Sequence, residues 1–154
     1  MNKELEAFVR ESNRIEGILR DPTWDEINVT ATFIFDTEPS IGALEAFVSV
    51  CAPGKSLRRY KGMDVRVGPH IAPPGGPDIP TALNTIIERA VDGDNVWRVH
   101  CDYETLHPFM DGNGRSGRVL WAWQMQHHGN GFPLGFLHHF YYQTLQNFDG
   151  RRNA

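Results

Sequence analysis

Apolar residues recur at helical spacing over most of the chain, and one short stretch alternates instead. Capping residues and terminal glycines divide the helical pattern into seven predicted helices. They cover about residues 3–16, a segment after Asp21-Pro22-Thr23, and about residues 40–50, 81–91, 95–106, 114–127 and 133–147. The fold class predicted from this pattern is mainly α.

The alternating stretch is Met63 to Val67, which is followed by a Gly68-Pro69 turn and a possible return over residues 70–72. This pattern predicts a small β-hairpin at most. The Pro/Gly-rich region around it, up to Pro80, reads as a structured loop and not as a linker between domains. We therefore expect residues 1–154 to form a single domain.

The predicted helix at residues 114–127 is apolar on nearly every side. It contains Val119, Leu120, Trp121, Ala122, Trp123 and Met125. A helix without a polar face is usually buried, so we expect it to be the central helix of a helical bundle. Its aromatic residues are interpreted as core.

Composition narrows the classes of function. The formal charge of −4 gives no basic field for nucleic acid, so any bound anion must be held locally. No apolar stretch of about 18 residues and no signal-peptide pattern occur, so we expect a cytosolic protein without membrane contact. The two cysteines, Cys51 and Cys101, are interpreted as reduced core residues.

The segment between two predicted helices, from His107 to Arg118, carries the candidate chemistry. Gly112 and Gly114 allow a tight turn, and the helix that follows leaves its first N–H groups unpaired. Such a turn can hold an anion. Arg115 and Arg118 stand in the first helical turn, where the macrodipole disfavours cations, so a phosphate chain or nearby carboxylates must compensate them.

Asp111 and His107 flank this turn. Asp111 could hold Mg²⁺ beside phosphates, or it could be a turn aspartate. His107 could accept a proton from a hydroxyl as a neutral base, or it could be structural. Because Pro108 follows it, His107 is expected to be extended.

The complete segment His107-Pro108-Phe109-Met110-Asp111-Gly112-Asn113-Gly114-Arg115-Ser116-Gly117-Arg118 closely resembles the signature of Fic domains. Every fixed position of that signature is filled. The Gly68-Pro69-His70 segment and the prolines after it are similar to the family's flap, so the resemblance spans roughly residues 12–136. It implies a helical bundle around a buried central helix with a β-hairpin flap at about residues 60–75.

The resemblance also implies an activity, which is transfer of AMP from Mg·ATP to a Ser, Thr or Tyr hydroxyl of a target protein. His107 would be the general base, Asp111 the Mg²⁺ ligand and Phe109 an anchor of the loop. The phosphates would be held by Asn113, by the backbone of Gly112 and Gly114, and by Arg115 and Arg118. Glycine at position 114 favours AMP transfer over kinase activity, because the phosphorylating branch has lysine there.

The flap is expected to dock the target protein by adding a strand to a peptide. The residues assigned to this docking are Met63, Val65, Val67 and His70. A purely structural hairpin is the alternative.

The first predicted helix places Ser12 and Glu16 at the end of its apolar stripe, just before Gly17. A carboxylate at the negative end of a helix needs a cation nearby. Ser12 to Gly17 resembles the Fic inhibitory motif, which implies that residues 3–17 form an inhibitory helix whose Glu16 pairs with Arg118. The alternative is a capped surface glutamate.

Two other functions remain open, and a third is disfavoured. The fold could bind nucleotide without transferring it, or it could remove AMP from a modified protein with Glu16 positioning a water. A metal-dependent hydrolase using His127, His128, His138 and His139 is disfavoured, because adjacent histidines do not share a helix face. A homodimer is possible, and the sequence does not identify the target.

Overall fold

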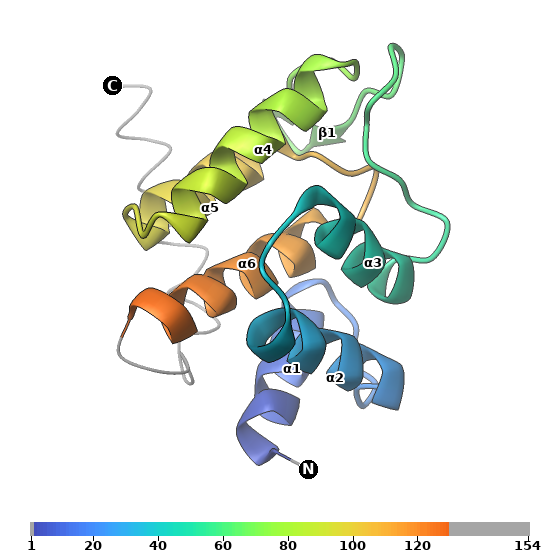
Figure 1. The fold of residues 1–154 in the computed structure, drawn as a ribbon. Coiled ribbons are helices and arrows are strands. Elements are labelled where there is room, and N and C mark those ends of the chain that lie inside the picture. The colour runs from blue at the N-terminus through green and yellow to red at the C-terminus, as the bar shows by residue number, and fades with distance from the viewer. Residues whose placement is uncertain (1, 130–154) are drawn as a thin grey trace.

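The structure is a computed structural model that describes residues 2–129. These residues form α1 (Lys3–Ile15), α2 (Trp24–Ala31), η1 (Thr32–Asp36), α3 (Ile41–Cys51), β1 (Arg66–Val67), β2 (His70–Ile71), α4 (Asp78–Val91), α5 (Val96–Leu106) and α6 (Asn113–His128) (Figure 1). The predicted mainly α class is confirmed. The predicted helix at residues 133–147 lies outside the described part.

Side-chain caps explain where most helices begin. Asn2, Ser40 and Asn95 each accept a hydrogen bond from an amide in the first turn of α1, α3 and α5, and Thr23 does the same for α2. Helix α4 begins at Asp78, three residues before the predicted start, because a proline is tolerated in the first turn where its N–H is not needed. The π-helical turn η1, which continues α2, was not predicted.

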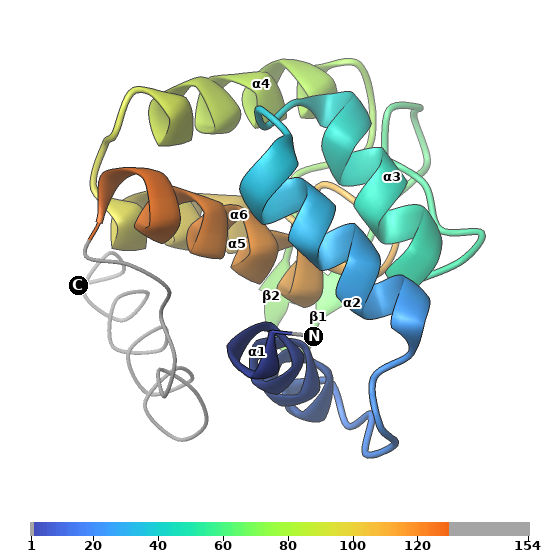
Figure 2. The same cartoon turned by 60° about the horizontal axis from the view of Figure 1, so that its bottom comes forward.

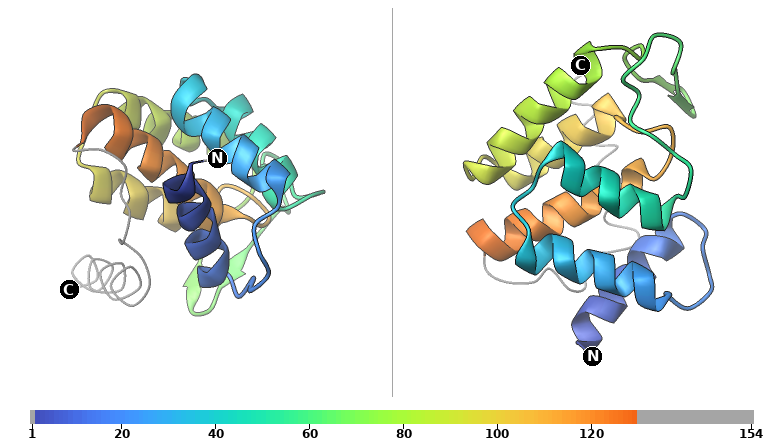
Figure 3. Two further views of the ribbon diagram at one scale, coloured as in Figure 1. Left: turned by 90° about the horizontal axis from the view of Figure 1, so that it is seen from below. Right: turned by 45° about the vertical axis from the view of Figure 1, so that its right-hand side comes forward.

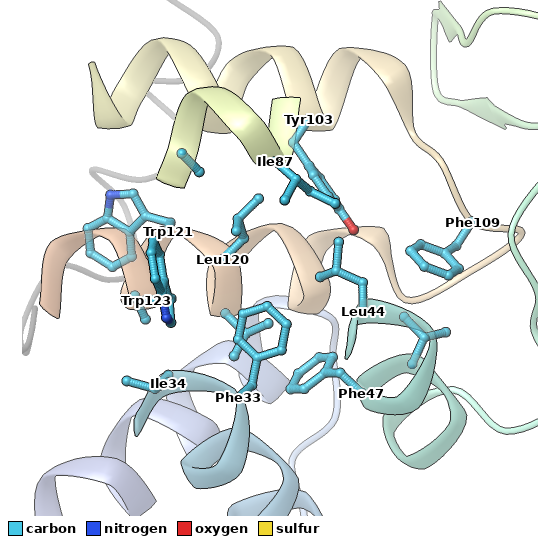
Figure 4. Close-up of a cluster of buried hydrophobic side chains, with 14 of the residues drawn as sticks. Phe33, Ile34, Leu44, Phe47, Ile87, Tyr103, Phe109, Leu120, Trp121 and Trp123 are labelled. Atoms are coloured by element: carbon cyan, nitrogen blue, oxygen red, sulfur yellow. The ribbon is translucent and has the colours of Figure 1, made fainter. Parts of the chain in front are cut away.

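Helix α6 lies in the middle of the bundle, as its apolar pattern predicts. It contacts α5, α4, α3, α1 and η1. Leu120, Trp121 and Trp123 are buried within the cluster in which Phe33, Leu44 and Tyr103 meet from other helices (Figure 4). The first turn of α6, which carries the candidate phosphate-binding residues, is therefore part of a packed core element.

Helix α1 packs against α2 and the start of α6 through a buried stripe that includes Leu5, Phe8 and Val9. Figures 2 and 3 show its C-terminal end near the N-terminal end of α6, and Glu16 at this end lines the same cleft as Val65 and Val67 of the hairpin. The helix ends at Ile15, with Glu16 as its C-cap and Gly17 at a positive φ of 76°. This geometry brings the end of α1 to the candidate site.

A buried carboxylate, Glu26, joins α1 to α2. Its oxygens accept hydrogen bonds from both terminal nitrogens of Arg20, at 3.0 and 2.8 Å, and from the amide of Thr23 at 2.8 Å. Asn13 near the end of α1 donates a further bond at 3.4 Å. The Arg20 guanidinium, together with the other two donors, lowers the pKa of Glu26 from 4.5 to about 2.

This low pKa predicts an acid-dependent loss of stability. A carboxyl whose pKa is depressed in the fold stabilises it above the unfolded value of 4.5, and this stabilisation is lost as pH falls towards about 2. The shift corresponds to at most about 3 kcal/mol, reduced by the exposure of Arg20. Urea unfolding between pH 2.5 and 6 should show a smaller pH slope in Glu26→Gln than in wild type. The exposed neighbour substitution Asp25→Asn should keep the wild-type slope, and equal slopes in all three proteins would contradict the prediction.

Candidate active site

The loop that precedes α6 is fixed on both sides. Phe109 is fully buried and forms an isolated β-bridge with Leu57. The Asn113 side chain accepts a hydrogen bond from the Phe109 amide and donates one to the Phe109 carbonyl, both at 2.8 Å. Phe109 thus lies where an anchor is expected, and the Asn113 amide group serves the loop itself.

Two glycines shape the N-terminal end of α6. Gly112 is the N-cap with φ 80°, a left-handed conformation that suits glycine. The first intrahelical bond runs from the Ser116 amide to the Gly112 carbonyl at 2.9 Å, so three earlier amides lie before it. A Cβ on Gly114 would clash with the carboxylate of Glu16, which shows that an anionic group lies directly against this backbone.

The carboxylate of Glu16 is bound by Arg118. The two side chains meet at 2.6 Å between Arg118 Nη2 and Glu16 Oε1. Arg118 also donates to Ser12, from Nε to the hydroxyl at 2.8 Å and from Nη2 to the carbonyl at 3.0 Å. The Arg118 side chain is 1% exposed and that of Glu16 is 35% exposed, so the pair spans the boundary between core and solvent.

Arg115 points in a different direction. Its guanidinium is buried and donates to the carbonyl of Cys51, at the C-terminal end of α3, at 2.5 Å. The negative end of the α3 dipole therefore compensates this cation. In this conformation Arg115 faces α1 and α3, while Arg118 faces the end of α1.

His107 is the C-cap of α5, and it is not extended as expected from the proline that follows. Its φ and ψ of 51° and 63° are left-handed. Among residues 2–129, it is the only non-glycine residue that has a positive φ. Hydrogen bonds from Arg58 to the carbonyls of His107 and Pro108 override this local preference. A conformation of this kind costs about 1–3 kcal/mol and is often found at functional sites.

The imidazole of His107 is held in one tautomer. Its Nδ1 lies 3.3 Å from the carbonyl of Glu104, which can only accept, so Nδ1 carries the proton and Nε2 carries the free electron pair. Burial lowers the pKa of His107 below its usual 6.5, and the charge of Arg58 acts in the same direction. His107 is therefore neutral near pH 7 and able to accept a proton.

These elements enclose a cleft of about 420 Å³. It is lined by Glu16, Val65, Arg66, Val67, Glu104, His107, Met110, Asp111, Asn113, Gly114 and Arg118. The structure thus brings together residues from the end of α1, the hairpin and the signature loop. Arg66, Glu104 and Met110 were not singled out from sequence, although Glu104 precedes His107 by one helical turn, a spacing that could have indicated it.

Asp111 lies in this cleft, where its Oδ1 accepts a hydrogen bond from the Gly112 amide at 2.7 Å. The other carboxylate oxygen can take part in binding a cation. A single carboxylate supplemented by phosphate oxygens is a common ligand set for Mg²⁺. The residues present therefore fit a Mg²⁺–phosphate complex at this place.

Some residues of the hairpin line the cleft, and others contact the body of the protein. Val65 and Val67 line the cleft, and Val67 is 47% exposed. The His70 side chain faces α5, where Nε2 contacts the Thr105 carbonyl at 2.9 Å, and the backbone of Met63 lies at the base of the hairpin. Of the four expected docking residues, two line the cleft and two hold the hairpin.

The histidines near the end of α6 cap other helices. His127 Nε2 contacts the Ile34 carbonyl at 3.0 Å and His128 Nε2 contacts the Val91 carbonyl at 2.9 Å. His138 and His139 lie outside the described residues. Among the described residues no group of three or more metal-ligating side chains is found.

Comparison with known families assigns the domain. Residues 60–125, which contain the hairpin, α4, α5 and most of α6, match the model of the Fic/DOC family. This match supports a Fic domain in the chain, and members of this family typically transfer nucleotide-derived groups to proteins. A search of curated proteins finds no match. Within residues 2–129, none of the helices has the length and apolar character required to cross a membrane.

Proposed function

We propose that this protein transfers AMP from Mg·ATP to a hydroxyl side chain of a target protein, and that Glu16 inhibits it. One observation carries the proposal. A neutral histidine faces the same cleft as the N-terminal end of a buried helix, and an anionic group already lies against that helix end. This arrangement suits attack by a hydroxyl on a bound phosphate.

In the proposed reaction, one proton is transferred, one bond forms and one bond breaks. His107 Nε2 accepts the proton of the acceptor hydroxyl, whose oxygen forms a bond to the α-phosphorus. The bond between the α-phosphorus and the bridging oxygen breaks, and pyrophosphate leaves. The amides at the start of α6 stabilise the charge on the phosphate oxygens. Mg²⁺ held by Asp111 would neutralise negative charge on the phosphates when it is bound.

The inhibitory role of α1 is part of this proposal. The family match begins at residue 60, so this role rests on the motif from Ser12 to Gly17 and on the contacts of Glu16. The carboxylate of Glu16 takes the guanidinium that a γ-phosphate needs, and it lies against Gly114. ATP must displace this carboxylate before Arg118 can bind its γ-phosphate.

The hairpin is the proposed docking site for the target protein. Val65 and Val67 line the cleft from the β1 side, while His70 holds β2 close to α5. The β1 edge is therefore the edge available to an added peptide strand. A peptide paired there would carry its hydroxyl towards His107.

The position of an isotopic label in ATP tests the proposed reaction. The protein and its Glu16→Gly variant are incubated with lysate proteins and with Mg·ATP labelled either at the α- or at the γ-phosphate. AMP transfer is expected to label protein from α-labelled ATP alone, with one AMP added per site by mass. Label from γ-labelled ATP would indicate a kinase instead, and no label from either would reject group transfer.

The ligand role of Asp111 makes a separate prediction. Asp111→Asn should abolish the tightening of ATP binding by Mg²⁺, because the neutral amide is a poorer ligand for a hard cation. AMP incorporation should fall at least about 10²-fold. Calorimetric titration of ATP with and without Mg²⁺, in the Glu16→Gly background, measures the first effect. The exposed substitution Asp25→Asn is the control, and Mg²⁺-dependent binding that survives in Asp111→Asn would remove this residue as the ligand.

A further inference from the structure

A buried arginine outside the signature connects the hairpin to His107. Arg58 is 0% exposed, and it follows Leu57, the bridge partner of the signature loop. Its Nε donates to the His107 carbonyl at 2.7 Å and its Nη2 to the Leu106 carbonyl at 2.8 Å. The guanidinium therefore caps the C-terminal end of α5, where a cation is favoured.

The third nitrogen of the same guanidinium binds the base of the hairpin. Nη1 donates to the carbonyl of Met63 at 3.1 Å and to that of Pro73 at 2.8 Å. These two residues stand on opposite sides of β1 and β2 in sequence. One planar group thus holds both ends of the segment that carries the hairpin.

The main chain of Arg58 adds two further bonds. Its amide donates to the Pro108 carbonyl at 2.9 Å, and its carbonyl accepts from the Gly76 amide at 3.0 Å. The residue is therefore bonded on one side to the loop after His107 and on the other to the segment after the hairpin. Its side chain is a planar fork with donors in fixed directions, which a flexible lysine cannot reproduce.

We infer that Arg58 is a positioning residue that fixes the distance between the target-docking hairpin and the base His107. This inference rests on the proposed function of the cleft. A hydroxyl held by the hairpin reaches the imidazole only if both parts keep one relative geometry, and a displacement of about 1 Å can reduce a rate about 10²-fold. The same hydrogen bond to the His107 carbonyl holds its left-handed backbone.

This role differs from general support of the fold. The phosphate-binding amides belong to α6, and the side chain of Arg58 bonds to the end of α5 and to the hairpin. Loss of Arg58 is therefore expected to reduce transfer while nucleotide binding is maintained. A purely structural role would weaken both together.

The test uses Arg58→Gln and Arg58→Lys in the Glu16→Gly background, with Arg59→Gln as the matched control. Arg59 is the next residue and pairs on the surface with Glu45 at 2.7 Å. Three quantities are measured in each variant, namely hydrogen exchange of peptides spanning residues 63–73 and 113–128, the dissociation constant of Mg·ATP, and AMP incorporation into the protein itself and into lysate proteins at saturating Mg·ATP.

In Arg58→Gln, we expect faster hydrogen exchange at residues 63–73 and unchanged hydrogen exchange at residues 113–128. Its AMP incorporation should fall about 10²-fold, while its affinity for Mg·ATP changes less than about twofold. Arg58→Lys keeps the buried charge and part of the hydrogen bonding, so it should fold. Its AMP incorporation and its exchange at residues 63–73 should lie between those of Arg58→Gln and the control. Should Arg58→Gln fail to fold, the comparison of Arg58→Lys with Arg59→Gln decides.

Three results would overturn the inference. These are unchanged exchange at residues 63–73, unchanged transfer despite faster exchange, and a loss of Mg·ATP affinity that parallels the loss of transfer. If the Glu16→Gly parent itself transfers no AMP, the proposed function fails, while the exchange of residues 63–73 still decides whether Arg58 holds the hairpin.

Discussion

Glu16→Gly is expected to increase AMP incorporation strongly over wild type, by roughly 10- to 100-fold. The estimate follows from the hydrogen bond between this carboxylate and Arg118, because hydrogen bonds to charged groups contribute about 1.5–3 kcal/mol. In wild type, ATP must break that bond before its γ-phosphate can use the guanidinium. The variant removes the carboxylate that competes for the guanidinium, which keeps its bonds to Ser12, and it opens the space against Gly114.

Graded variants make the measurement specific. Ser12→Ala removes the hydroxyl that accepts from Arg118 Nε but leaves the carboxylate in place, so it should activate less than Glu16→Gly. Glu4→Gln removes one negative charge from the exposed start of the same helix and should behave as wild type. Initial rates of AMP incorporation and the affinity for Mg·ATP should rise together along this series.

The opposite result carries information about the alternative reaction. If Glu16→Gly incorporates AMP no faster than wild type, α1 is not inhibitory. If the variant also loses the ability to release AMP from a modified protein, Glu16 instead orients a water for AMP removal. Both reactions are measured by intact mass, with loss of the AMP adduct as the readout for the second.

Most of the fold could be predicted from local signals in the sequence. The helix boundaries follow from capping residues such as Thr23 and from glycines such as Gly129, and the central position of α6 follows from its uniformly apolar surface. The pairing of Glu16 with Arg118 was implied by two motifs about a hundred residues apart. Each of these features depends on a short stretch of residues whose pattern is visible without the fold.

The features that sequence did not predict depend on contacts between distant segments. Pro108 favours an extended His107, yet the hydrogen bonds made by Arg58 hold it left-handed. Helical spacing places Arg115 and Arg118 on neighbouring faces but does not say which element each face meets, and only the fold shows Arg115 at the end of α3. Glu26 was not singled out from sequence, because its buried contact with Asn13 of α1 arises from the packing of two helices.

His107→Ala in the Glu16→Gly background should lose transfer by about 10²–10⁴-fold, the usual loss when a general base is removed. Binding of Mg·ATP should be maintained, because the phosphates are assigned to the amides of α6 and to Arg118. His128→Gln is the matched control, since this exposed histidine caps α4 and lies outside the cleft. The comparison shows whether the loss comes from the imidazole in the cleft or from the replacement of any histidine.

The pH profile gives this prediction a second readout. A general base acts only when it is neutral, so transfer should rise with pH through the pKa of His107 and then level off. Because burial lowers that pKa, the rise in kcat/KM should lie below pH 6.5, and wild-type His107 should be fully competent at pH 7. The residual activity of His107→Ala should lack this rise. A variant that keeps both the rate and the acidic limb of its parent would show that another group accepts the proton, and the assignment of His107 as the base would have to be abandoned.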